Sequence, residues 1–200
     1  MGSIITLKNC RASFLTLGEP EYFSGAKQKP TDKRRWSATG LLPYDDPQIK
    51  AVDAIVEEVG KAKWERKWSV IFENIKTTPN LFFKLDGKRK SYAGYEGNFA
   101  LTAHRNEDKG RPVVLDTDKS PIYKPDGNLY EGKGGRLYSG CYCNLQIEIW
   151  AQDNASGKGI RATLLAIQRF KDGDAFAGGS AADVDAFDEV VEGGDAEDLS

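Results

Sequence analysis

A strand-like alternation of apolar and polar residues constrains the fold of this chain more than any other feature. The alternating segments are rich in β-branched and aromatic residues and are bounded by Gly, Pro, Asn or Asp, as is typical of β-strands. These segments are residues 4–17, 34–42, 98–105, 111–116, 137–152 and 159–170. The last two flank "DNASGK", a connection typical of a hairpin. The sequence therefore predicts a mainly β protein.

One segment follows a helical period instead. Its apolar residues recur at spacings of three and four: Ile49, Val52, Ile55, Val56 and Val59. Asp46 precedes them as a potential N-cap, and Pro47 suits the first helical turn. The sequence predicts one amphipathic helix over about residues 46–66.

The order of these elements favours a closed or nearly closed β-barrel. A parallel α/β sheet would need a helix after nearly every strand, whereas this chain offers one helix and long polar connections such as residues 84–97 and 116–136. Among barrels with one inserted helix, the OB-fold is the leading candidate. A β-sandwich is the alternative that the periodicity leaves open.

Charge is distributed unevenly along the chain. There are 28 Lys and Arg against 30 Asp and Glu, and every cation precedes Gly178. Residues 178–200 hold eight of the acids, so residues 1–177 keep 28 cations against 22 acids, a net charge of +6, beside a tail of −8. We expect one domain over 1–177, a disordered acidic tail over 178–200, and a polyanionic partner for the body.

The N-terminal segment and the cysteines indicate the compartment. Lys8 and Arg11 interrupt the first apolar pattern, which predicts neither a signal peptide nor a membrane-spanning helix, so we expect no membrane partner and a cytoplasmic location. Cys10, Cys141 and Cys143 are expected to be buried small hydrophobic residues, as a reducing cytoplasm allows. A disulfide or a metal-binding pair is the alternative.

Few residues point to catalysis. His104, the only histidine, has no Ser or Cys pattern beside it that would suit a catalytic triad. The basic, Gly-rich stretches "YEGKGGRLY" and "NASGKGI" do not match the phosphate-loop spacing and suit hairpin turns or loops that contact a nucleic-acid backbone. Asp172 and Asp174 lack a third ligand, so a metal-dependent nuclease is the least favoured alternative. The sequence predicts no enzyme, no metal and no cofactor.

Aromatic side chains interleaved with cations are a stronger signal. In the segment 137–152, the odd positions form one apolar face: Leu137, Cys141, Cys143, Leu145, Ile147 and Ile149. Tyr138, Tyr142 and Trp150 then fall on the opposite face, where they could stack on unpaired bases. The alternative is that the predicted helix covers this aromatic face as a second core.

These patterns give a set of candidate contacts to nucleic acid. The residues expected to stack on bases are Trp36, Tyr95, Tyr138, Tyr142 and Trp150. The residues expected to follow phosphates are Lys8, Arg11, Arg34, Arg35, Lys88, Arg89, Lys90, Arg105, Lys133 and Arg136.

Two long segments carry a family resemblance. "RRWSATGLLPYDDPQIKAVDAIVEEVGKAKW" and "GRLYSGCYCNLQIEIWAQDNASGKGIRATLLAIQRFKDGDAFAGG", followed by an acidic tail, resemble the bacteriophage single-stranded DNA-binding proteins. The resemblance implies an OB-fold that binds single-stranded DNA without sequence preference and without catalysis, in replication, recombination or repair. A homodimer is left open.

The resemblance also implies a role for the tail. Such tails bind replication or recombination proteins and compete with DNA for the basic groove; many end in an aromatic residue, whereas this one ends in Asp198, Leu199 and Ser200. The candidate partner-binding residues are Asp183, Asp185, Phe187, Asp188, Glu189, Glu192, Asp195, Glu197, Asp198 and Leu199. The alternative function is a regulatory protein-interaction module whose tail mimics DNA.

Overall fold

The computed structural model describes residues 2–23, 27, 32–78, 80–155 and 157–176. The predicted tail, residues 178–200, lies outside the described residues, so its disorder and the domain boundary before it stay predictions. No helix in the described part of the chain is long and apolar enough to cross a membrane.

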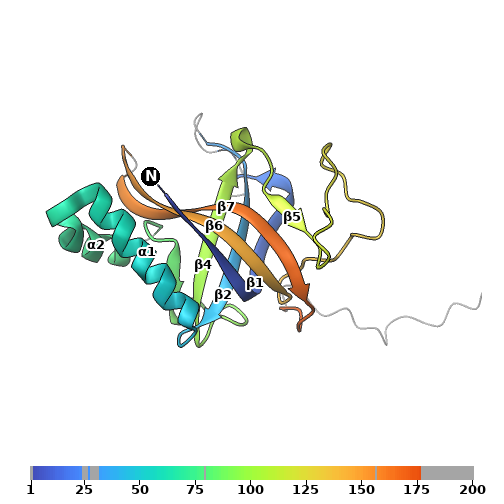
Figure 1. Ribbon diagram of the computed structural model, residues 1–200, viewed down its shortest axis with the longest axis horizontal. Helices are drawn as coiled ribbons and strands as arrows, with labels where there is room; N and C mark the ends of the chain where they lie inside the picture. The colour runs from blue at the N-terminus through green and yellow to red at the C-terminus, as the bar shows by residue number, and fades with distance from the viewer. Residues whose placement is uncertain (1, 24–26, 28–31, 79, 156, 177–200) are drawn as a thin grey trace, which may run out of the picture.

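Five strands close into a barrel (Figure 1). They are β1 (Ser3–Glu21), β2 (Arg35–Pro43), β4 (Asn98–Asn106), β6 (Tyr142–Asn154) and β7 (Gly157–Lys171). Antiparallel pairs join them in the order β4-β2-β1-β6-β7, and a parallel contact between His104 of β4 and Thr163 of β7 closes the ring. The short strands β3 (Lys84–Asp86) and β5 (Val113–Leu115) pair with β4 and β7. The fold is a five-stranded barrel of the OB type, as predicted.

Strand alternation builds the barrel core. On β6, the side chains of Cys143, Leu145, Ile147 and Ile149 are buried, and their neighbours in sequence face outward. All three cysteines are free and buried, and burial raises the pKa of the Cys10 thiol to about 12. The prediction that the cysteines serve as small hydrophobic residues is confirmed.

The predicted helix is present but continues further than expected. Helix α1 (Pro47–Trp64) begins at Asp46, whose carboxylate accepts from the Gln48 amide at 2.8 Å. It ends at Glu65, which adopts a left-handed φ of 48°. After a 3₁₀ turn (Glu65–Lys67), the chain forms a second helix, α2 (Trp68–Thr77). The single helix predicted over about 46–66 is therefore one of two α-helices in the described part of the chain.

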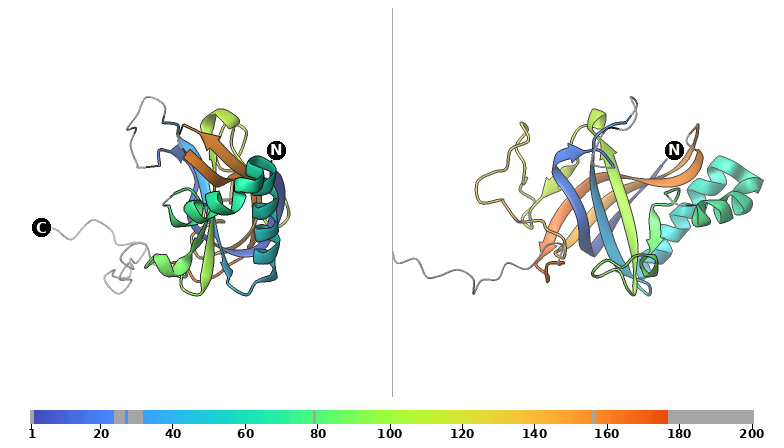
Figure 2. Two further views of the ribbon diagram at one scale, coloured as in Figure 1. Left: turned by 90° about the vertical axis from the view of Figure 1, so that its left-hand side faces the viewer. Right: turned by 180° about the vertical axis from the view of Figure 1, so that it is seen from behind.

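Aromatic stacking holds α2 against α1. The ring of Trp68 lies 5.7 Å from that of Trp64 and 4.5 Å from that of Phe72. Gly60 makes room for this stack, since a Cβ at that position would approach the Trp68 ring to 2.4 Å. Both helices lie on one side of the barrel, and the loop between β5 and β6 projects on the other (Figure 1, Figure 2). The buried residues of α1 join the barrel core, not a second core over the outward aromatic face of β6.

The predicted limits of two strands, β6 and β1, differ most from the structure. β6 begins at Tyr142, not at residue 137, because the chain turns through Gly140, which has a φ of 106°. Tyr138 therefore precedes the strand and does not share its outward face. β1 extends beyond the predicted 4–17, and its pairings contain three register shifts, the second of which, between Ser13 and Thr16, lies beside Phe14.

Candidate nucleic-acid interface

The outward faces of β1, β2 and β4 lie side by side. Cross-strand pairing arranges their residues in three rows: Arg11, Leu41 and Ala100; Ser13, Thr39 and Thr102; Thr16, Ser37 and His104. Leu41 and Ala100 are buried in a cluster with Tyr95, and Ser13 and Thr39 are buried as well. Thr102, Thr16, Ser37 and His104 are exposed or partly exposed. Beyond the third row, Thr163 of β7 lies beside His104. We call this surface, with the side chains that border it, the outer strip.

Three aromatic rings border one end of the outer strip. The ring of Tyr92 lies 4.9 Å from that of Phe14 and 5.3 Å from that of Tyr95. Phe14 is 54% exposed and Tyr92 is 49% exposed, whereas Tyr95 is 4% exposed and its hydroxyl bonds to Ser13 and Thr39. Tyr95 thus anchors the cluster to the barrel, and the other two rings present apolar faces to solvent.

Backbone geometry turns Phe14 outward. The register between β1 and β2 shifts between Ser13 and Thr16, and Phe14 there has a φ of 47°. A bulge of this kind redirects a side chain, and a left-handed φ is strained for a bulky residue. Strain of this kind is concentrated at functional sites.

Arg11 lies at the same end. Its guanidinium donates to the carbonyls of Gly140 and Asp174, at 3.3 and 2.8 Å, and lies 4.5 Å from the ring centroid of Phe176. These neutral partners leave the charge of Arg11 available to an anion. Tyr142, 5.8 Å from the Arg11 guanidinium and 4.6 Å from the Lys171 ammonium, adds an aromatic ring between two cations.

A cluster of basic groups occupies the other end. Burial first, and then Arg35 and Arg161, lower the pKa of His104 to about 4. Burial and the charge of Arg161 lower the pKa of Arg35, and burial lowers that of Arg161. The guanidinium of Arg35 lies 4.4 Å from the ring of Phe23, which is 72% exposed. Two partly buried guanidinium groups therefore repel each other beside a neutral imidazole.

No carboxylate relieves this repulsion within the described part of the chain. Arg161 donates to the side-chain oxygen of Gln152 at 3.1 Å and to the carbonyl of Asn80, both of which are neutral. Neither Arg35 nor Arg161 forms an ion pair with another described residue. Because a partly buried charge is costly unless it is paired, this end of the outer strip is suited to an anion such as a phosphate.

Two aromatic residues predicted to stack on bases are buried instead. Trp36 is 7% exposed, its indole nitrogen donates to the Gly18 carbonyl at 2.8 Å, and the guanidinium of Arg111 lies 5.3 Å from its ring. Tyr95 is buried beneath the exposed rings, as described above. Neither ring offers a face to an incoming base, so base stacking is no longer expected of them.

Several predicted phosphate contacts hold protein groups. Arg34 pairs with Glu107 at 2.8 Å, and Arg105 donates to two backbone carbonyls. Lys133 and Arg136 both face the buried carboxylate of Asp116, at 2.6 and 3.8 Å. These cations order the surrounding loops.

Of the remaining predicted cations, Lys90 lies beside the outer strip, whereas Lys8, Lys88 and Arg89 lie beside other residues. Lys8 lies beside α1. Its backbone N–H donates to the side-chain oxygen of Gln48, and its carbonyl accepts from the Gln48 amide nitrogen. In the turn after β3, Lys88 faces Tyr44 and Arg89 donates to a carbonyl of α2. Lys90 faces Tyr92, 6.0 Å from its ring centroid, and so adjoins the outer strip.

Tyr138 and Trp150 have fixed polar ends. The Tyr138 hydroxyl donates to the Gly173 carbonyl at 2.9 Å and also bonds to the Asp172 carboxylate, which pairs with Arg169. Asp172 is thus held by a hydroxyl and a cation, and among the described residues there is no group of three or more His, Cys, Asp or Glu side chains that could hold a metal ion. Trp150 points outward from β6, and its indole nitrogen donates to Thr163 at 3.0 Å.

Sequence reasoning missed five residues of the outer strip: Phe14, Phe23, Tyr92, His104 and Arg161. His104 and Arg161 come together only when β4 and β7 close the barrel, which no local pattern reveals. Phe23 and Tyr92 carried a usable signal, because each lies beside Ser in a polar context that does not need a buried ring.

The fold and the outer strip define an OB-type nucleic-acid-binding barrel. The chain belongs to the family described as the ssDNA-binding protein of Enterobacter phage Enc34, whose family model matches residues 3–199. A relative, putative protein p50 of Acyrthosiphon pisum secondary endosymbiont phage 1, is 38% identical over 188 residues, which cover 93% of each chain.

Solved structures agree with this assignment. The single-stranded DNA-binding protein from bacteriophage Enc34 superposes with a TM-score of 0.65 at 26% identity, covering 92% of this chain and 90% of that one. Its complex with single-stranded DNA gives a TM-score of 0.65 at 24% identity, covering 86% and 88%. The single-stranded DNA-binding protein gp2.5 of bacteriophage T7 shares the fold, with a TM-score of 0.52 at 15% identity over 86% of this chain and 93% of that one.

Proposed function

We propose that the outer strip binds single-stranded DNA with little dependence on sequence, and that the chain acts without catalysis in phage DNA replication, recombination or repair. The observation that most supports this function is the pairing of exposed rings, Phe14 and Tyr92, with the unneutralised guanidinium groups of Arg35 and Arg161 on one surface. Aromatic faces stack on any base, and cations follow the phosphates. Family membership supports the same function.

The acidic tail supports a second part of the proposal. Eight carboxylates in residues 178–200 follow a body of net charge +6, so the tail is a tethered competitor for the outer strip and a handle for replication or recombination proteins. Phe187 and Leu199 are its apolar anchors. The site of action is the cytoplasm of the bacterial host, and a homodimer stays a prediction for light scattering to test.

A titration of fluorescently labelled oligo-dT tests the binding function. Anisotropy measured at two salt concentrations is expected to show tight binding that weakens steeply as salt rises, because phosphate contacts release counterions. Absence of binding at low salt would overturn the proposal and favour the alternative, a protein-interaction module whose tail mimics DNA. Intact oligonucleotide after incubation with magnesium is expected of a non-enzymatic protein.

A further inference from the structure

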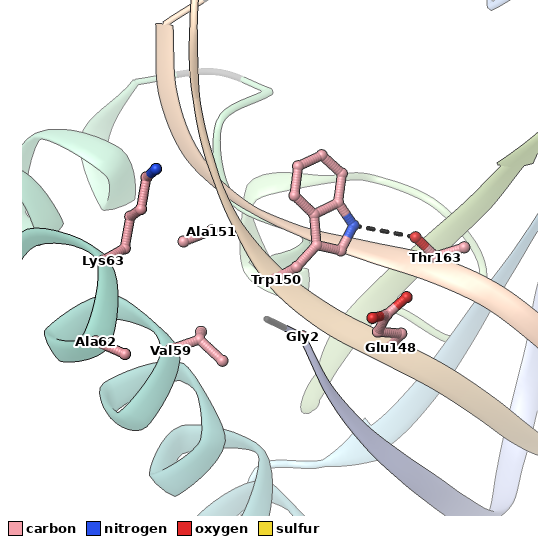
Figure 3. A pocket seen from close by; sticks show the side chains of 8 residues that line it. All are labelled: Gly2, Val59, Ala62, Lys63, Glu148, Trp150, Ala151 and Thr163. Carbon is pink, nitrogen blue, oxygen red and sulfur yellow. Dashed lines mark hydrogen bonds between the residues drawn. The ribbon is translucent and has the colours of Figure 1, made fainter.

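A pocket of about 410 Å³ lies between the second half of α1 and the outward side of β6 and β7 (Figure 3). Its lining combines apolar, cationic, acidic and aromatic side chains, among them Val59, Lys63, Glu148, Trp150 and Thr163. Its volume falls within the usual range for small-ligand pockets, roughly 300–1,000 Å³.

Trp150 gives the pocket a rigid aromatic wall. The hydrogen bond from its indole nitrogen to Thr163 fixes the ring, which projects from β6 with Lys63 of α1 across from it (Figure 3). The other tryptophans of the chain, Trp36, Trp64 and Trp68, are at most 7% exposed, whereas Trp150 is partly exposed. An immobile, accessible indole loses little entropy when a base stacks on it.

The two charged residues of the pocket are available to a ligand. Neither Lys63 nor Glu148 forms an ion pair with another residue in the described ranges. Gly2 packs directly against Glu148, so that a Cβ on Gly2 would come within 2.5 Å of the carboxylate. The N-terminal backbone thus confines Glu148 beside the ring of Trp150.

The pocket adjoins the outer strip. Thr163 is the neighbour of His104 on β4 and of Glu148 on β6, so His104 and Glu148 are separated by two strand spacings, about 10 Å. Trp150 is likewise paired with Arg161, one of the two unneutralised guanidinium groups. A strand bound along the outer strip can therefore place its next base in the pocket.

We propose that this pocket binds one unstacked base of the single-stranded DNA and prefers bases that carry an exocyclic amino group. The inference rests on the proposed function. Trp150 stacks on the base, Lys63 binds a phosphate, and the Glu148 carboxylate accepts from the amino group of cytosine, adenine or guanine. Thymine carries a carbonyl oxygen, O4, where cytosine carries its amino group. An oxygen at that position cannot donate a hydrogen bond to the Glu148 carboxylate.

Intrinsic tryptophan fluorescence tests the site separately from binding. Adding oligo-dC to the full chain is expected to quench the emission of Trp150 in parallel with the anisotropy change, and Trp150→Phe is expected to bind with much less quenching. A wild-type chain that binds by anisotropy with no change in emission would overturn the pocket as a base site. Absence of any anisotropy change would instead overturn the proposed function itself.

Glu148→Gln tests the base preference. Wild-type affinity for oligo-dC is expected to exceed that for oligo-dT by about threefold, the low end of what one hydrogen bond contributes, which stays small beside the sequence-independent stacking and phosphate contacts. An amide can turn either its oxygen or its NH₂ toward the base, so the variant is expected to lose this ratio. Lys63→Ala is expected to weaken both oligonucleotides alike and keep it. An unchanged ratio in Glu148→Gln would overturn the preference, provided that melting temperatures match.

Discussion

The ammonium of Lys133 lies 2.6 Å from the carboxylate of Asp116, within the long loop that joins β5 to β6. The Asp116 side chain is 5% exposed, and that of Lys133 is 19% exposed. The hydrogen bond from Lys133 is the main cause that holds the pKa of Asp116 below its usual range. A lysine that the sequence offers as a phosphate contact is therefore part of the internal structure of the loop.

Replacing this lysine is expected to reduce stability rather than DNA binding. Lys133→Met leaves a buried carboxylate without its nearest cation, which costs about 3 kcal/mol of unfolding free energy and lowers the melting temperature by about 6–12 °C. Calorimetry checks this, with Lys119→Met on the same loop as an exposed control. If the Lys133→Met variant were as stable as wild type and bound oligo-dT more weakly, Lys133 would instead be a DNA contact.

Two adjacent arginines separate ion pairing from phosphate binding. Arg34 is neutralised by Glu107, whereas Arg35 has no carboxylate partner among the described residues. Arg35→Ala is expected to weaken oligo-dT binding about tenfold and to reduce the slope of log affinity against log salt by about 0.7. Arg34→Ala is the matched control and is expected to change both quantities little. Equal effects of the two variants would contradict the assignment.

Phe14 combines backbone strain with exposure. Phe14→Asn places a residue that tolerates a left-handed φ at this position, and the relief of about 1 kcal/mol offsets lost ring contacts of similar size. Thermal stability is therefore expected to stay close to wild type, while affinity for oligo-dT falls about tenfold through the loss of one stacked base. Tyr130→Asn, on the β5–β6 loop, is a control that should bind normally.

The fold could be predicted from sequence wherever periodicity was local and long. The barrel strands and α1 follow clear periods, and the alternation that buries Cys143 and Ile147 is visible directly. Helix α2 was missed because stacking of Trp68 on Trp64 of α1 holds it in place, and aromatic residues are not typical helix formers. β3 spans only three residues and depends on its pairing with β4.

The site was less accessible to prediction because it depends on non-local geometry. Trp36 lies two residues before Ala38 on β2, so both side chains point to the same face of the strand. Ala38 points into the barrel, and strict alternation would therefore have placed Trp36 inside as well. Phe14 owes its position to a bulge, and Arg161 meets Arg35 only after closure. Composition indicated the kind of ligand correctly, but only the closed barrel distinguishes cations that bind protein from cations left for DNA.

His104 is expected to make stability and DNA binding depend on pH in opposite ways. Its pKa is about 4 in the folded chain, below the ordinary value of 6.5, so the unfolded chain binds the proton more readily between these values. Melting temperature should therefore fall as pH decreases from 6.5 to 4. A nearby phosphate favours the protonated imidazole, so oligo-dT affinity should rise as pH falls from 7 to 5. His104→Gln should lose both trends, and an unchanged pH profile would exclude phosphate from this end of the outer strip.

Removal of the acidic tail should change DNA binding in a direction that separates the two candidate functions. If residues 178–200 compete in cis for a body of net charge +6, their deletion tightens oligo-dT binding several-fold at low salt and has little effect at high salt. A full-length variant with all eight tail acids changed to Asn or Gln should bind like the deletion. Phe187→Ala with Leu199→Ala should keep the competition, because it keeps the charge, and weaken capture of a replication protein. Weaker DNA binding after deletion would contradict the competition and favour a tail that makes its own productive contacts.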